Sequence, residues 1–174
     1  MQLSDHRDIA ATPEMVWSAI LNPEVLMACI PGCESMKGSP ETGYEAVVVQ
    51  KVGPVSARFT GLVQLTDMTA GQAVTISGEG KGGAAGFAKG GARVTLAAEG
   101  DGTRLTYEVQ ANVGGKIAQL GSRIIDGFAK KLADQFFENF KSALEHPAKD
   151  DSAETVESDE NTNKKGWFRR IIGG

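Results

Sequence analysis

The sequence predicts an α+β domain in which a curved antiparallel sheet is covered by one long helix. Apolar residues recur every three or four positions from Lys116 to Leu144, which is typical of an amphipathic helix. Between Tyr44 and Val113 they alternate instead, as they do in strands that bury one face only. Hairpin signals join these strands in succession, so we expect the helix to lie across their apolar face.

Composition and charge limit the class of protein. The 174 residues are enough for one ordinary domain with additional segments, and 41% hydrophobic residues are enough for a core. A net charge of −4 argues against nucleic-acid binding. Because no secretory signal opens the sequence and no run of about 18 apolar residues occurs, we expect a cytoplasmic protein with reduced Cys29 and Cys33.

The elements that precede the sheet are short. Residues 2–9 are a weak strand candidate. Thr12-Pro13-Glu14 supplies a hydroxyl cap, a proline at the first position and an acid in the first turn, so we expect a helix from here to Asn22-Pro23. A second short helix is expected over 24–30, because Pro31-Gly32 stops it.

From residue 44 onward the sequence predicts an antiparallel meander, with a turn at Gly53-Pro54 and a hairpin at Gly100-Asp101-Gly102. Apolar side chains share one face of each strand. The other face carries Thr, Arg, Glu and Gln and therefore meets water. The predicted strands are residues 44–48, 55–65, 74–78, 92–98 and 105–113.

The apolar face of this predicted sheet carries small side chains where a tight core would have Leu or Ile. Two interpretations remain open. Either the long helix approaches the sheet closely, or an apolar gap is left for a guest molecule. The small residues are Ala57, Gly61, Gly78, Ala92, Ala98 and Ala111.

A G-x-G-x-x-G pattern at 78–83 follows a strand, but no helix follows it, so it does not predict a dinucleotide site. The stretch 78–92 is rich in Gly and Ala and predicts a flexible loop in which Phe87 forms a lip or lid. An ordinary long hairpin is the alternative interpretation of the same stretch.

No set of residues predicts catalysis or a metal site. Cys29 and Cys33 lie four positions apart, but neither His6 nor His146 is spaced to complete a zinc site with them. No nucleophile, base and orienting group can be assembled from the sequence motifs. We therefore expect no catalytic residue and no metal ligand.

Charge divides the chain into three parts. Residues 1–144 form the predicted domain, residues 145–163 hold seven acids and one lysine and predict a disordered linker, and residues 164–174 hold four cations and no acid. A helical tail would place its apolar side chains on one face and its cations on the other, which is typical of a peripheral membrane anchor. A partner-binding peptide is the alternative. The predicted membrane-binding residues are Lys164, Lys165, Trp167, Phe168, Arg169, Arg170, Ile171 and Ile172.

Four stretches together resemble the CoxG family of carbon monoxide dehydrogenase proteins, within the START-like helix-grip superfamily: residues 30–36, 51–65, 80–96 and 107–140. The resemblance covers about residues 1–144. It implies a sheet of about seven strands wrapped around the long C-terminal helix, with an apolar pocket between them. Members of this family look like accessory factors, not catalytic components, of molybdenum-type carbon monoxide dehydrogenases.

The resemblance also implies a function. The family is linked to recruiting that enzyme to the cytoplasmic membrane and, for some members, to binding a quinone that accepts its electrons. We therefore expect a non-enzymatic protein on the inner face of the membrane that has no covalent cofactor and carries an isoprenoid quinone such as menaquinone. Tyr107 is the expected contact for a quinone oxygen, unless it caps the core. The expected lining residues are Phe59, Val63, Leu65, Phe87, Tyr107, Leu120, Ile124, Phe128 and Leu132.

Three alternatives remain open. A pure assembly or docking factor would have a solid core and no ligand. A pocket enzyme of the cyclase or hydrolase type would need an acid or base in the pocket, and the expected lining offers only Tyr107. The partner could also be another molybdenum hydroxylase, because related sequences accompany xanthine-oxidase-like enzymes.

Overall fold

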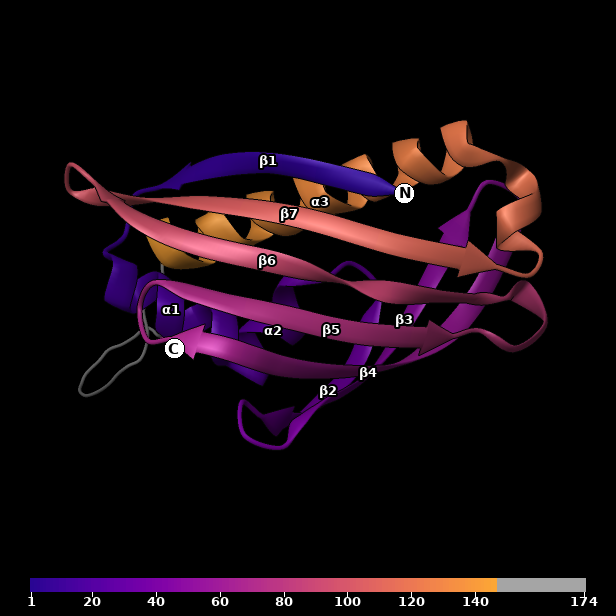
Figure 1. The fold of residues 1–174 in the computed structure, drawn as a ribbon, viewed down its shortest axis with the longest axis horizontal. Coiled ribbons are helices and arrows are strands. Elements are labelled where there is room, and N and C mark those ends of the chain that lie inside the picture. Colours follow the sequence, from indigo (N-terminus) through magenta and orange to yellow (C-terminus); the bar gives the residue numbers. More distant parts are fainter. Residues whose placement is uncertain (147–174) are drawn as a thin grey trace, which may run out of the picture.

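The structure, a computed structural model, describes residues 1–146 (Figure 1). Its strands are β1 (Gln2–Ile9), β2 (Cys33–Ser39), β3 (Gly43–Val52), β4 (Val55–Thr69), β5 (Ala73–Lys81), β6 (Phe87–Glu99) and β7 (Gly102–Gly114). Its helices are α1 (Pro13–Leu21), α2 (Pro23–Cys29) and α3 (Ser122–Glu145), with two 3-10 turns, η1 (Gly83–Ala85) and η2 (Ile117–Leu120).

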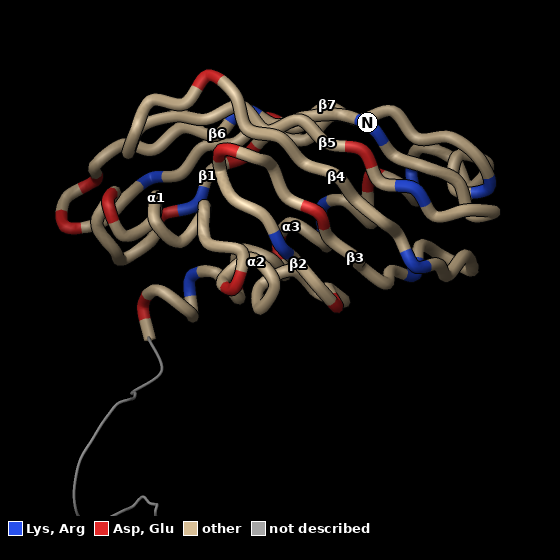
Figure 2. Tube along the Cα trace, turned by 90° about the horizontal axis from the view of Figure 1, so that it is seen from below, with Lys and Arg blue, Asp and Glu red and all other residues tan. Residues whose placement is uncertain are grey.

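All seven strands pair antiparallel in the order β1-β7-β6-β5-β4-β3-β2, so the first strand lies beside the last. The sheet curves into an arch, and α2 and α3 lie beneath it (Figure 2). The α3 backbone lies beside α2 and β1. The predicted α+β fold, with a seven-stranded antiparallel sheet around a long C-terminal helix, is confirmed.

The two short helices start where the sequence signals predicted. The Thr12 hydroxyl accepts a hydrogen bond from the Met15 N–H at 3.3 Å, and Pro13 occupies the first turn of α1. Asn22 ends α1 and also caps α2, because its side-chain oxygen accepts from the Glu24 N–H at 2.9 Å. These caps hold both helices across one end of the arch.

The stretch 78–92 is not a flexible loop, so that prediction was wrong and the alternative of a long hairpin is confirmed. The fifth strand continues to Lys81 and the sixth begins at Phe87, with only η1 and its flanking residues between them. Glycine is a weak strand former in isolation. Here the register, which places Gly78 opposite Gly90, is held by full-length partner strands on both sides.

The long helix starts later than predicted. Residues 117–120 form the η2 turn, and Gly121 then adopts a φ of 92°, which a helix cannot contain. The α-helix therefore begins at Ser122 and runs for 24 residues, about 36 Å. Of the predicted linker and tail, all but Glu145 and His146 lie outside the described residues.

The edge strand β2 was not predicted. Its sequence is short and mixed in polarity, and its pairing with β3 shifts register between Cys33 and Ser35. A bulged edge strand has one partner only and keeps no clean alternation of apolar residues. Within residues 1–146 no helix combines the length and the apolarity that crossing a bilayer requires.

Candidate functional site

The concave face of the sheet carries two separate apolar clusters. We call one the large cluster; it lies at the α1 end and is centred on Val74, Leu105 and Phe140. We call the other the small cluster; it lies at the opposite end and is built on Val52, Ala85 and Ile117. Two clusters on one face mean that the interior is not a single continuous core.

The apolar residues on the inward face of α3 pack against both clusters, but one of them, between the two clusters, packs against neither. Phe136 packs against the large cluster and Phe128 against the small cluster. Leu132, one helical turn from each, belongs to neither cluster and is only half-buried. The helix thus spans a region where its apolar side chain meets no buried partner.

The sheet shows the same interruption at the same level. On β4, Phe59 packs against the small cluster and Leu65 against the large cluster, while the two inward residues between them belong to neither. The neighbouring strands continue this band with glycine and alanine. We call this region the interior gap. It is bounded by Gly61, Val63, Gly78, Gly80, Ala111 and Leu132.

A β-carbon built on each of three glycines tests whether α3 fills the gap. At Gly80 such an atom would meet nothing within 4 Å. At Gly61 its nearest neighbours would be two backbone oxygens of adjacent strands, at 3.8 and 3.9 Å. At Gly78 they would be atoms of Leu62 and Val63. No atom of α3 lies within 4 Å of these β-carbon positions, so close approach of the helix does not account for these three glycines, and the interpretation of a gap remains.

The polar groups nearest to this face are already engaged. The Tyr44 hydroxyl donates to the Leu21 carbonyl at 2.6 Å, and burial raises its pKa. The Thr103 hydroxyl, in the large cluster's region, donates to the Ala11 carbonyl at 2.7 Å. Both histidines of the described chain, His6 and His146, are exposed. Both buried hydroxyls are thus committed to backbone carbonyls.

Tyr107 lies in the large cluster, not at the gap. Its ring stacks on Phe137 with centroids 5.0 Å apart, and the Arg7 guanidinium lies over both rings. Arg7 in turn pairs with Asp5 at 2.7 Å and Asp134 at 2.6 Å. Burial raises the Tyr107 pKa. This arrangement fits the alternative expectation that Tyr107 caps the core.

The expected lining residues divide into three groups. Val63 and Leu132 border the interior gap, and Leu65 and Tyr107 lie on its large-cluster side. Phe87 and Ile124 are 43% and 42% exposed at the far end of the domain. Phe59, Leu120 and Phe128 pack in the small cluster. A lining role stays a prediction for all nine residues.

The two cysteines are free thiols. Cys29 is buried in the large cluster, and burial raises its pKa. The Cys33 thiol donates to the Ser35 carbonyl at 3.4 Å. Among the described residues no three side chains of the His, Cys, Asp and Glu types gather as a metal site would require.

Comparison with known proteins gives one family and a common fold. The family model for CoxG, a carbon monoxide dehydrogenase subunit, matches residues 6–145. A conserved protein from Geobacillus kaustophilus shares 29% identity with a TM-score of 0.78, over 83% of this chain and 95% of its own. A comparison with curated proteins found no match.

More distant solved structures share the fold alone. A START superfamily protein from Mycobacterium smegmatis has a TM-score of 0.63 at 13% identity, covering 84% of this chain and 99% of its own. A protein from Thermus thermophilus has a TM-score of 0.65 at 15% identity, covering 86% and 100%. The START-like architecture is therefore shared by proteins of very different sequence.

Proposed function

Because the chain belongs to the CoxG family of carbon monoxide dehydrogenase proteins, we propose that it is a non-catalytic accessory protein of a molybdenum carbon monoxide dehydrogenase. It holds an isoprenoid quinone in the interior gap and has no covalent cofactor. Its C-terminal tail links the enzyme to the inner face of the cytoplasmic membrane and so to the quinone pool.

The interior gap is the single observation that supports ligand carriage. Apolar side chains that face one another without contact lose dispersion energy, and an empty apolar volume destabilises a protein. A guest that fills the gap restores those contacts. An isoprenoid chain suits it because such a chain is apolar and needs no hydrogen-bond partner between Val63 and Leu132.

Organic extraction of the full-length protein, followed by mass spectrometry, tests carriage. Protein purified from a quinone-producing host is expected to release an isoprenoid quinone. A matched sample of an unrelated soluble protein from the same host controls for carry-over. Protein that releases no apolar molecule from such a host would leave only an assembly or docking role.

The membrane link rests on the tail sequence, which lies outside the described residues. Each cation near an anionic leaflet contributes about 1 kcal/mol, and the apolar face adds partial burial. We expect the dehydrogenase to float with anionic vesicles only when this protein is present. Replacement of Trp167, Phe168 and Ile171 by Ser should abolish that co-flotation. Unchanged co-flotation would contradict an anchoring role for the tail.

A further inference from the structure

The end of the domain that carries the small cluster is basic. In an antiparallel sheet, alternate strands run in the same direction, so β3, β5 and β7 all finish at this end. Lysines lie at or beside each of these strand ends, and two more cations lie at the starts of β6 and α3. We call this surface the basic end (Figure 2). Its cations are Lys51, Lys81, Lys89, Lys116 and Arg123.

These five cations are exposed and, within the described chain, none takes part in an ion pair. Two acids, Glu79 and Asp126, are close to them in sequence and form no ion pair with them. Of the cations that do form ion pairs, Arg7 and Arg104 lie toward the other end and Lys130 lies on α3. Arg58 lies at the same end as Lys81 and is paired with Glu34.

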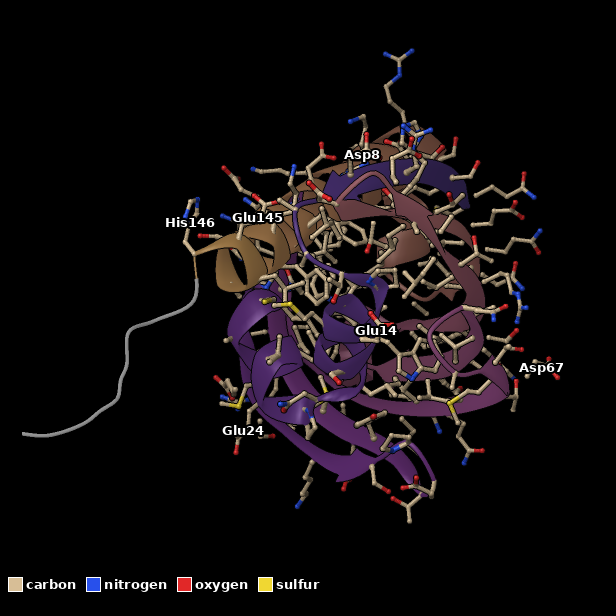
Figure 3. All side chains as sticks on the ribbon, turned by 90° about the vertical axis from the view of Figure 1, so that its left-hand side faces the viewer. Asp8, Glu14, Glu24, Asp67, Glu145 and His146 are labelled. Carbon is tan, nitrogen blue, oxygen red and sulfur yellow. The ribbon has the colours of Figure 1, made fainter. Side chains whose placement is uncertain are left out.

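The opposite end of the domain is acidic. Figure 3 looks at that end and shows Asp8, Glu14, Glu24, Asp67 and Glu145 distributed over it. The turns there add Glu41, Glu99 and Asp101. The charges of a domain with a small net charge are thus separated along its long axis, which creates a field that orients the molecule near a charged surface.

Two large apolar side chains are exposed at the basic end. Phe87 lies over the backbone of Gly114, which has no β-carbon to displace the ring. Ile124 lies beside the turn at Gly53. A hollow of about 430 Å³ adjoins Phe87, and its other lining residues are Glu79, Lys81, Gly83, Ala84, Gly86 and Gly115.

We infer that the basic end is a lipid-contact surface that docks on an anionic leaflet, with Phe87 and Ile124 inserting between head groups. Lysines that form no ion pair among residues 1–146, grouped around exposed apolar tips, match the charge and the polarity profile of such a surface. Four of the five cations are Lys, which protein–protein interfaces are depleted in. An anionic lipid surface therefore fits these residues better than an acidic protein does.

This inference shares membrane association with the proposed function but rests on different residues, which are all described. It deepens that function, because docking would bring the small-cluster end of the interior gap to the bilayer.

Partitioning of the full-length protein onto vesicles of phosphatidylglycerol and phosphatidylcholine tests the inference. The double substitution Lys81→Gln with Lys116→Gln should weaken partitioning about 30-fold, which is about 1 kcal/mol for each cation. The control is Lys37→Gln with Lys141→Gln, which removes the same charge from the acidic end. This control should change partitioning by less than about 3-fold.

A second background separates this surface from the tail. In a full-length variant that carries Lys164→Gln, Lys165→Gln, Arg169→Gln and Arg170→Gln, residual binding to anionic vesicles should persist. It should be lost when Lys81→Gln and Lys116→Gln are added. Equal partitioning of both double variants in both backgrounds would overturn the inference, as would loss of dehydrogenase binding with unchanged vesicle binding. If only the anchoring role of the tail is wrong, the variant with the four tail substitutions will partition onto vesicles as strongly as the wild type. Circular dichroism confirms that each variant folds.

Discussion

At the residue scale, three glycines on the inner face keep the gap open. Glycine in a strand interior costs roughly 0.5–1 kcal/mol relative to alanine, so Gly61, Gly78 and Gly80 carry a stability cost. Alternation along the sequence identified the first two as small inward residues. Gly80 was missed, because 78–92 was interpreted as a loop and a loop has no inner face. The partner strands that order this stretch are distant in sequence and could not be inferred from it.

Filling the gap at Gly80 gives the first prediction. On ligand-free, refolded protein, Gly80→Val should leave the free energy of unfolding unchanged or raise it by up to about 1 kcal/mol, because the β-carbon enters open space and strands favour valine. Urea denaturation measures this. Ser77→Val, on the outer face of the same strand, controls for strand propensity. A loss of about 1–3 kcal/mol would mean that the site is already packed.

Alkaline pH gives the second prediction. Burial raises the pKa of both Tyr44 and Tyr107 above the ordinary value of 10.0. Above that value the unfolded chain loses its phenol protons before the folded chain does, so stability is full below about pH 10 and falls as pH rises further. Tyr107→Phe keeps the stacked ring but removes the phenol proton. The free energy of unfolding of this variant should therefore decrease less steeply with rising pH. Urea titrations between about pH 8 and 11 measure it; an identical slope in both proteins would contradict it.

At the element scale, α3 both stabilises the domain and spans the gap. Its period was evident from the sequence, and the helix type was predicted correctly. The start of the helix was predicted too early. The apolar period continues through residues 117–120, but these form a 3-10 turn that ends at Gly121. Phe137 was also missed, since it lies beside the main stripe. Its burial depends on Tyr107 and Arg7, which only the folded sheet brings to it.

Two leucine truncations give the third prediction, at the level of packing between α3 and the sheet. Leu105 is 1% exposed and lies in the large cluster. Leu105→Ala should therefore lower the free energy of unfolding by about 2–5 kcal/mol. Leu132→Ala should cost less than about 1.5 kcal/mol in ligand-free protein, because its neighbours do not enclose it. Denaturation of both variants decides the point. Equal costs would indicate a continuous core and no gap.

At the scale of the whole molecule, charge is separated along the long axis. The sequence showed the acidic linker and the basic tail, because charge runs are visible directly. It did not show the basic end, whose cations come from five segments that only the sheet topology brings together. The described part of the chain ends at His146, which lies at the acidic end, about one helix length from the basic end. Eighteen residues can extend at most about 60 Å, so tail and basic end can reach one bilayer.

The molar ratio of extracted quinone to protein, measured in parallel for three full-length proteins, tests the central claim most directly. The wild type and Ser77→Val are expected to release about one isoprenoid quinone per chain, whereas Gly80→Val should release almost none because its side chain occupies the gap. The same ratio in Gly80→Val as in the wild type, or no apolar molecule from the wild type, would contradict the account.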